Sequence, residues 1–314
     1  MAIVTSDFLS ALFTSYSVVW EQAFLAAQNQ QNFERYCTTV PSTTDTESYN
    51  WLGNVPAMKQ WTDTRDIQGM SAYNYSLKNL HYEVTIGVDR DTLEDDKYNL
   101  IQPRIQQLGL EAARFPANQA ITALVDGGST GNNSYDGVTY FSASHVEDGS
   151  GLQSNTNTGS GVSLANIRTD LLAARTKMRR MKDNKGRPMN IIPDLVIIPP
   201  DLQDVFEQLI TTNLVAGAGV AGTLVGQVAM SNNLMGAVDI YVNAYLTDTS
   251  DWFLMATKYP MKPLIYQLRK APEFNAVTDP NDFVVFNQRQ FYYGVDSRFA
   301  VGYGMWQTCQ RVTN

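Results

Sequence analysis

The sequence predicts an α+β protein, and three observations support this fold class. Two long stretches, residues 6–32 and 97–126, repeat apolar side chains at the i, i+3 and i+4 spacing of an amphipathic helix. Residues 80–88 alternate apolar and polar side chains, as a half-buried strand does. The chain shows no regular alternation of helices with strands, which a doubly wound parallel sheet would require.

Composition excludes several classes of protein. The 314 residues are 44% hydrophobic and 17% charged, and no apolar run approaches the roughly 18 residues of a membrane span. A net charge of -8 repels a phosphate backbone, which argues against general nucleic-acid binding. Two distant cysteines, Cys37 and Cys309, fit a reduced compartment, and the first residues lack a secretion signal. We therefore expect a soluble protein made in the cytoplasm.

The predicted helix over residues 6–32 carries a broad aromatic stripe that includes Trp20 and Phe24. A helix with so wide an apolar face must lie against something, either its own core or a neighbouring molecule. Both possibilities stay open from the sequence, and Trp20 and Phe24 are candidates for contact between subunits. Residues 37–64 lack a clear period, and Pro41 and Pro56 indicate turns there.

Residues 67–77 and 80–88 predict the two strands of a long hairpin, with its turn at residues 76–79. An isolated two-stranded hairpin is only marginally stable in water, so we expect a partner to cover it. It is therefore interpreted as an arm that contacts another molecule. The candidate contact residues on it are Tyr73, Tyr75, Leu77, Lys78 and Tyr82.

An acidic cluster that includes Asp95 and Asp96 precedes the predicted helix over residues 97–126. Carboxylates are favourable near a helix N-terminus, so a solvated helix entrance is the simpler interpretation of this cluster. The helix itself would be about 40 Å long at about 1.5 Å per residue, with a bend at Pro116. Its length predicts a structural spine for the fold.

Residues 126–161 hold 8 of the 21 glycines and no lysine or arginine, which is typical of a linker, although the aromatic residues at 135–141 can dock against a core. Another helix is predicted over residues 163–182. Residues 168–187 contain eight basic and two acidic residues, a local charge of +6. Such a segment can pair with an acidic segment, such as residues 89–96, on another copy. We therefore expect self-assembly, with Arg175, Arg179 and Arg180 as candidate contacts alongside Asp95 and Asp96.

The second half of the chain predicts mostly strands. Residues 195–198 are a short apolar run between prolines, and Asp201 begins a helix to about residue 210. Residues 214–237 have no clear assignment. Short strands are expected near residues 238–246, 252–257 and 263–268. The end of the chain, from Phe283 to Met305, predicts two strands joined by a turn at residues 296–297.

The sequence offers little support for catalysis. The glycines Gly217, Gly219 and Gly222 have the GxGxxG spacing of a dinucleotide-binding turn, but neither a convincing strand before them nor a clear helix after them is predicted. The two histidines, His81 and His145, lack metal-ligand spacing. We expect no catalytic residue, cofactor or metal. An enzyme that uses the 217–222 segment for a nucleotide is the alternative hypothesis.

Several motifs resemble the major head subunit of Mu-like phages and prophages, the gpT type. The resemblance covers roughly residues 37–146, and the second half is similar in layout to the HK97-like capsid fold. The motifs that carry it are VPSTT at 40–44, YNWLG at 49–53, residues 56–61, EDD at 94–96, YDG at 135–137, Phe141 and His145. Where the family often has acidic residues before that histidine, this chain has SAS at 142–144.

The resemblance implies a major capsid protein of a tailed double-stranded DNA phage or prophage, and a tail or decoration protein is another alternative. It implies hexamers and pentamers that form an icosahedral shell in the host cytoplasm. Expected partners are a separate scaffolding protein, a portal at one vertex, a possible decoration protein and DNA enclosed without specific binding. The implied divisions are an N-terminal arm (1–64), an E-loop hairpin (65–92), a peripheral domain (93–189), an axial domain (190–282) and returning peripheral strands (283–314).

Overall fold

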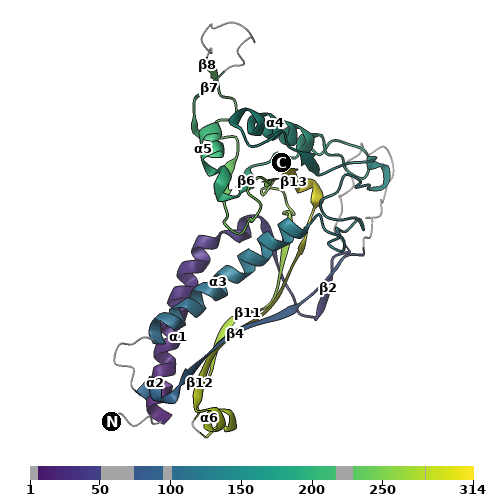
Figure 1. Cartoon of the computed structure of the whole chain (residues 1–314). Coiled ribbons are helices and arrows are strands. Elements are labelled where there is room, and N and C mark those ends of the chain that lie inside the picture. Colours follow the sequence, from purple (N-terminus) through teal and green to yellow (C-terminus); the bar gives the residue numbers. More distant parts are fainter. Residues whose placement is uncertain (1–5, 51–73, 95–100, 217–228, 280) are drawn as a thin grey trace, which may run out of the picture.

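The computed structural model describes residues 6–50, 74–94, 101–216, 229–279 and 281–314. These residues form two packed parts, which we call the arm and the lobe (Figure 1). The arm is a four-stranded sheet with helices α1 and α3, and the lobe is a five-stranded sheet with helices α4 and α5. Helix α1 begins at the far tip of the arm, whereas the chain ends inside the lobe (Figure 1).

The sheet of the arm has the strand order β1-β11-β12-β4. Strand β11 runs parallel to β1 and antiparallel to β12, and β12 pairs antiparallel with β4. The bounds of these strands are β1 Cys37–Pro41, β4 Leu80–Asp89, β11 Leu264–Val277 and β12 Gln290–Tyr303. The alternation at residues 80–88 therefore predicts a strand correctly, and β4 forms an edge of the sheet.

Two long helices, α1 (Ser6–Gln31) and α3 (Ile101–Asp126), cover one face of this sheet (Figure 1). Both confirm the predicted helices where the structure describes them, and α3 continues through the buried Pro116. The two helices approach closely at Gly109, where an added Cβ would lie 2.7 Å from the backbone carbonyl oxygen of Trp20. Glycine at this position thus allows the aromatic stripe of α1 to pack on the protein's own core.

The sheet of the lobe has the strand order β5-β13-β10-β6-β9. Strands β6 and β10 are buried along their whole length, because the sheet is covered on both faces, and this explains their continuous apolar sequences. Helices α4 (Leu164–Arg180) and α5 (Gln203–Thr211) pack beside each other on the lobe. The strand bounds are β5 Thr156–Thr158, β6 Leu195–Ile198, β9 Asp239–Val242, β10 Trp252–Met255 and β13 Cys309–Thr313.

Short elements connect the two parts or extend from them. Strand β2 pairs antiparallel with β3, and β7 pairs antiparallel with β8. Helix α6 lies at the tip of the arm, where it joins β11 to β12 (Figure 1). These elements are η1 Phe33–Arg35, β2 Thr46–Ser48, β3 Ser76–Lys78, α2 Arg90–Glu94, η2 Asp148–Ser150, η3 Pro200–Leu202, β7 Leu214–Ala216, β8 Ala229–Ser231, α6 Phe283–Gln288 and η4 Trp306–Thr308.

The predicted hairpin of residues 67–88 is wrong in its pairing. Strand β4 pairs with β12, which is more than 200 residues later in the sequence, and residues 76–78 pair with β2 instead of forming a turn. Residues 67–73 lie outside the described residues. The alternation of apolar and polar residues identifies a strand but not the strand that pairs with it. The predicted pairing with the segment next to it in sequence is therefore wrong. Strand β4 is therefore part of the arm's sheet and not a projecting hairpin.

The predicted end of the chain also needs correction. Residues 283–288 are helix α6, and β12 runs without a turn through residues 296–297. Asp296 and Ser297 stay in the ladder, opposite Glu83 and Tyr82 of β4. The Asp296 carboxylate accepts a hydrogen bond from Lys270 Nζ at 2.6 Å on the adjacent strand, so its polar side chain is satisfied without a turn.

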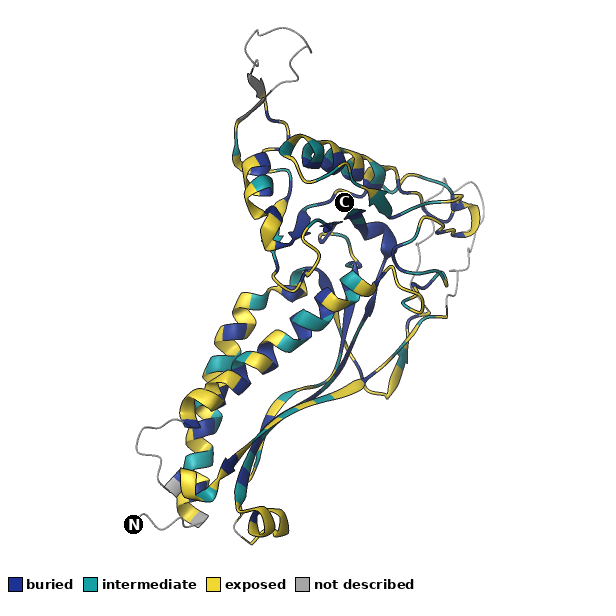
Figure 2. Ribbon diagram, in the orientation of Figure 1, coloured by how far each residue is buried: buried dark blue, intermediate teal, exposed yellow. Residues whose placement is uncertain are grey.

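The two sheets do not coincide with the expected domain divisions. Strand β11, inside the expected axial span, belongs to the arm, whereas α4 and β13, both expected in the peripheral part, pack in the lobe. The chain passes between arm and lobe around residues 263 and 304, where the Gly304 backbone N–H donates to the Pro263 carbonyl oxygen at 2.8 Å. The buried apolar side chains form two cores (Figure 2). One lies in the distal arm, and the other fills the lobe and the part of the arm next to it.

Candidate assembly surfaces

The paired strands β2 and β3 hold together the two ends of residues 49–75. The turn before β2 is fixed by Glu47, whose Oε1 accepts hydrogen bonds from Ser42 Oγ at 2.8 Å and from the backbone N–H groups of Thr43 and Thr44 at 2.9 and 3.1 Å. These donors, the Thr43 N–H first, lower the pKa of Glu47 to about 2. The charged carboxylate therefore organises this turn at neutral pH.

Asn79 connects this strand pair to the arm's sheet. Its buried amide nitrogen donates to Ser42 Oγ at 2.8 Å and to the Thr44 carbonyl oxygen at 2.9 Å. Its amide oxygen accepts from Gln267 Nε2 at 2.8 Å, and Gln267 Oε1 accepts from the Tyr49 hydroxyl at 2.7 Å. This network fixes the base of the 49–75 segment on strand β11.

The candidate contact residues near that base lie mostly against the protein's own core. The Tyr75 hydroxyl accepts the Tyr303 backbone N–H at 2.7 Å, and burial raises the pKa of Tyr75 to about 12. Leu77 packs against the same core. The Tyr82 ring lies 4.9 Å from that of Phe115. Lys78 is 68% exposed, at the end of β3 and not at a hairpin tip. Tyr73 lies outside the described residues.

Trp20 lies in the apolar core of the arm. Its side chain is only 7% exposed, and its ring stacks on those of Phe24 and Phe274 at 5.1 and 5.8 Å. Phe24 is partly buried in the same cluster. The aromatic stripe therefore packs on the chain's own sheet, where α1 lies beside α3 and its rings contact Phe274 of β11 and Tyr293 of β12. Of the two possibilities left open by the sequence, the protein's own core is the one observed.

The basic residues predicted on α4 differ in their environments. Arg175 is half-buried, and burial first, then the neighbouring Arg179 guanidinium, lower its pKa. Lys177 Nζ is hydrogen-bonded within the lobe, where it donates to the Thr156 carbonyl oxygen at 2.6 Å. Arg179 and Arg180 are exposed at the end of the helix. Of the three predicted arginines, Arg179 and Arg180 are thus better placed than Arg175 to meet another molecule.

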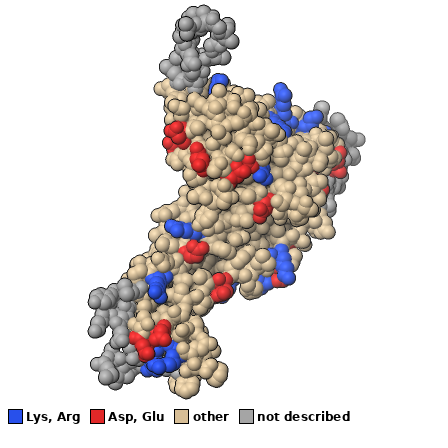
Figure 3. All heavy atoms as spheres, in the orientation of Figure 1, with Lys and Arg blue, Asp and Glu red and all other residues tan. Residues whose placement is uncertain are grey.

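Acidic side chains lie on the other side of the lobe. Asp201, Asp204 and Glu207 are exposed on η3 and α5. Figure 3 shows acidic residues over α5 and basic residues around the C-terminal end of α4, on opposite flanks of the lobe. The predicted acidic partners Asp95 and Asp96 lie outside the described residues, and nearby Asp91 pairs with Arg289 of its own chain at 2.9 Å. The α5 carboxylates are not among the contacts predicted from the sequence, although their spacing of three residues places Asp204 and Glu207 on one helix face.

His145 lies in a buried polar cluster that the sequence analysis did not predict. Its Nδ1 is 2.6 Å from Asp136 Oδ2, and its Nε2 is 3.2 Å from both the Tyr140 carbonyl oxygen and Asn155 Oδ1. The ring stacks on the indole of Trp306 at 4.1 Å between centroids. His145 is fully buried, so its ring is not accessible from the surface. Its contacts attach the glycine-rich 126–161 segment to the lobe.

Glu147 forms a second buried cluster beside it. Its Oε1 accepts hydrogen bonds from the Tyr135 hydroxyl, from Trp306 Nε1 at 3.1 Å and from Gln307 Nε2. Burial, and then the charge of this carboxylate, raise the pKa of Tyr135 well above its ordinary value. Because the donors come from two distant segments, Glu147 joins the glycine-rich segment to the end of the chain.

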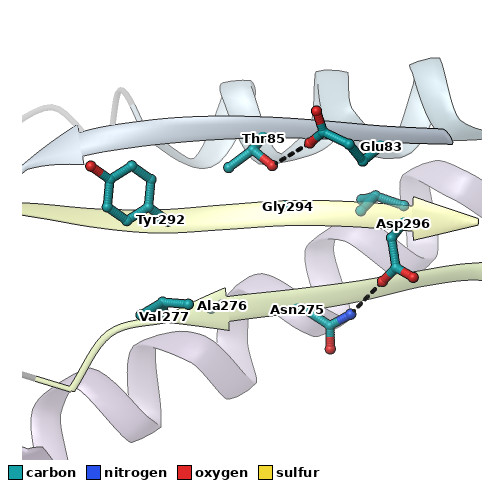
Figure 4. A pocket seen from close by; sticks show the side chains of 9 residues that line it. Glu83, Thr85, Asn275, Ala276, Val277, Tyr292, Gly294 and Asp296 are labelled. Atoms are coloured by element: carbon teal, nitrogen blue, oxygen red, sulfur yellow. Dashed lines mark hydrogen bonds between the residues drawn. The ribbon is translucent and has the colours of Figure 1, made fainter. Parts of the chain in front are cut away.

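The hollows of the arm are open and shallow. One of about 190 Å³ lies on the sheet face away from the helices, with Glu83 and Thr85 of β4, Tyr292 and Asp296 of β12 and Asn275 of β11 around it (Figure 4). A second, of about 210 Å³, lies between β4 and α3. Within the described residues, no group of three or more His, Cys, Asp or Glu side chains could hold a metal ion. Among the described helices, none is both long and apolar enough to span a membrane.

Residues flanking the GxGxxG glycines form a strand pair. Strands β7 and β8 pair antiparallel, with Leu214 opposite Ser231 and Ala216 opposite Ala229. The glycines themselves lie outside the described residues. A dinucleotide-binding turn joins a strand to a helix within a βαβ unit, whereas these flanks are the two strands of one antiparallel pair. The described surroundings therefore do not favour the nucleotide hypothesis.

Comparison with known proteins gives consistent matches. The family model described as "Mu-like prophage major head subunit gpT" matches residues 9–170, 163–246 and 232–314. The chain is 27% identical over 312 residues to the Mu-like prophage FluMu major head subunit of Haemophilus influenzae, covering 99% of this chain and 75% of that protein. It is 28% identical over 306 residues to the major capsid protein of Escherichia phage Mu, covering 97% and 73%.

Solved structures agree with these relatives. A chain of the bacteriophage JBD30 procapsid superposes with a TM-score of 0.59 at 26% identity, covering 99% of this chain and 76% of that chain. A virus-like particle from Pyrococcus furiosus has a TM-score of 0.55 at 10% identity, covering 95% and 99%. At that low identity the second likeness concerns the fold alone.

Proposed function

Because this chain belongs to the Mu-like prophage major head subunit gpT family and is a major capsid protein of a tailed phage, we propose that its arm and lobe are the peripheral and axial parts of an HK97-like shell subunit. It is a structural protein of the virion capsid and not an enzyme. The observation that carries this function is the match of almost the whole chain to a procapsid subunit, in sequence and in fold.

Geometry supports the assignment of the two parts. The arm has a 26-residue helix, α3, beside two 14-residue strands, β11 and β12, which together form a stiff elongated body. The lobe has charged flanks of opposite sign, so neighbouring lobes around a capsomer axis would attract each other. The pairing of β2 with β3 brings residues 49 and 75 together on the arm.

Partners beyond other copies of the chain belong to the same proposal. The subunits form the capsid by self-assembly, and we propose hexamers and pentamers as its units, a separate scaffolding protein and a portal at one vertex. The JBD30 capsid is decorated with trimers of a minor capsid protein, and we propose a comparable protein here. The net charge of -8 supports a shell that encloses DNA without binding it, since like charges repel.

Electron microscopy tests the proposed function directly. We expect the protein, expressed alone and with its neighbouring gene products, to give shells, tubes or ring-shaped capsomers in negative stain. Sedimentation velocity should then show species far larger than the 35.0 kDa chain. A homogeneous monomer or small dimer under all these conditions would contradict the proposal, and a nucleotide-induced rise in Tm would favour the enzyme alternative.

A charge-reversal pair tests the contact between lobes. We expect Arg179→Glu with Arg180→Glu to reduce capsomers and shells at least tenfold, because each reversed side chain would face Asp204 and Glu207 of the next copy. Single exposed ion pairs contribute only about 0.2–1 kcal/mol, but the contact repeats around every capsomer. Asp204→Lys with Glu207→Lys in the same chain should restore assembly, measured by sedimentation velocity. Failure of this rescue, with both variants folded, would show that the two flanks do not meet.

A further inference from the structure

Helix α6 exposes two large apolar side chains at the tip of the arm. Phe283 is 77% and Phe286 78% exposed, and Figure 2 shows this helix as exposed at the end of the molecule. We call these two residues the knob. Clusters of large exposed apolar side chains mark interaction sites, because water contact with them is unfavourable.

The knob is held in a fixed position. The Asp282 carboxylate caps α6 by accepting the Val284 backbone N–H at 2.9 Å. Val285, between the two phenylalanines, is 5% exposed and packs in the core of the distal arm. At the other end, the Arg289 backbone N–H donates to the Val285 carbonyl oxygen at 2.8 Å. The phenylalanines therefore point outward from an anchored helix and not from a loose loop.

An apolar recess lies elsewhere on the same arm, between the edge strand β4 and helix α3. Its volume is about 210 Å³, and its walls include the apolar side chains of Tyr82, Val84, Ala112, Phe115 and Val295 together with the acidic side chains of Glu83 and Glu111. An apolar cavity of about 150 Å³ can hold a benzene molecule, so this recess has room for one phenyl ring. Because β4 is at the edge of the sheet, the recess opens toward the side of the arm.

Charges of both signs lie beside the recess, whereas those beside the knob are acidic. Arg104 and Arg114 line the groove that continues the recess along α3, and both are exposed. Asp279 and Asp282 flank the N-terminal end of the knob and are exposed too. Within the described part of the chain, none of these four side chains is in an ion pair. Because Glu83 and Glu111 repel the carboxylates beside the knob while the two arginines attract them, the charges favour the orientation that places Asp279 and Asp282 against Arg104 and Arg114.

We propose that the knob of one copy docks in the recess of a second copy of this chain, with one phenyl ring inside it. The proposal rests on the proposed function, since the chain is a shell subunit that assembles with itself. Knob and recess are different surfaces of the same molecule, so the contact is heterologous and can close into a ring. It would join the tip of one arm to the side of the next.

Knob and recess can be disrupted separately. We expect Phe283→Ser with Phe286→Ser to lower the yield of shells at least tenfold while the Tm of the subunit stays within a few degrees. Ala112→Leu should block assembly to the same extent from the other side, because the added carbons occupy the recess. Leu152→Ser, which removes an apolar side chain that is 73% exposed in the lobe, is the matched control and should assemble normally.

A charge swap tests the same contact without changing any apolar side chain of the arm. Arg114→Asp alone should reduce shells several-fold, and adding Asp279→Arg in the same chain should restore them. A cysteine pair identifies the contact itself: Phe286→Cys with Ala112→Cys should give covalent oligomers on oxidation, whereas Phe286→Cys alone should not. Both native cysteines are buried, so they should not interfere.

The outcomes separate this inference from the proposed function. If the wild type and Leu152→Ser form no shells, the proposed function fails. If they form shells and the knob variant does too, the knob has no role in assembly and the inference is overturned. If the knob variant fails but the cysteine pair gives no covalent oligomers, the knob docks elsewhere and the recess assignment is wrong.

Discussion

Replacing Glu147 by alanine is expected to lower the free energy of unfolding by about 3–5 kcal/mol. The variant leaves the Tyr135 hydroxyl, Trp306 Nε1 and Gln307 Nε2 without this acceptor in a buried site. An unsatisfied buried donor costs about 1–3 kcal/mol, and the lost side chain also leaves a cavity. The alanine variant no longer has the unfavourable free energy of burying a charged carboxylate. We expect this gain to be smaller than the combined penalty of the three donors that lose their acceptor.

Urea denaturation of the subunit, followed by circular dichroism, measures this effect. Glu147→Gln is the matched control, because it keeps a side-chain oxygen at the same place, and it should cost clearly less than the alanine variant. A loss of about 3–5 kcal/mol is a large part of the roughly 5–15 kcal/mol stability of a typical domain, so shells should also fail to form at 37 °C. An alanine variant within about 0.5 kcal/mol of the wild type would show that the cluster does not hold the two segments together.

The second large effect is expected at Gly304, where the chain leaves the arm for the lobe. A Cβ at this position would lie 2.2 Å from the Lys262 carbonyl oxygen and 3.2 Å from that of Pro263. Both neighbours are backbone atoms, so they cannot move aside as a flexible side chain would. We expect Gly304→Ala to lower the free energy of unfolding by at least about 2–3 kcal/mol, because it overpacks a well-packed site. We also expect it to change the angle between arm and lobe.

Gly87→Ala is the matched control for that variant. Its added Cβ would meet the Gln290 side-chain oxygen at 2.9 Å, and this flexible side chain on the open face of the sheet can move away. We expect Gly87→Ala to lower the free energy of unfolding by less than about 1 kcal/mol and to form normal shells. Thermal unfolding and negative-stain microscopy of both variants make the comparison. Equal Tm values for the two would contradict a rigid junction at Gly304.

Several elements were predictable because their signals are local. The helical period at residues 6–32 and 163–182, the alternation at residues 80–88 and the apolar run at 195–198 all give the observed elements. The family, too, could be identified from short motifs in the first half of the chain. Such patterns depend on residues within a few positions of one another, and a single sequence records these directly.

The surroundings of individual apolar side chains were predicted less well than the elements. Trp20 was a candidate for contact between subunits because its helix is more apolar than a solvated helix, yet the stripe packs on the protein's own sheet. Conversely, Phe283 and Phe286 were assigned to an ordinary strand, whereas the structure exposes them at the tip of the arm. Whether an apolar residue faces its own core or solvent depends on the position of distant strands.

The sequence by itself therefore determined the α+β class, the long helices, the individual strands and the family of this capsid protein. Only the tertiary structure decided that β4 pairs with β12, that residues 263 and 304 join arm and lobe, and that Glu147 binds Trp306 and Gln307. The physical reason is the sequence distance of these contacts. Each joins residues that are 41 to 219 positions apart, and local propensity contains no information about which distant partner a strand or a buried polar group will find.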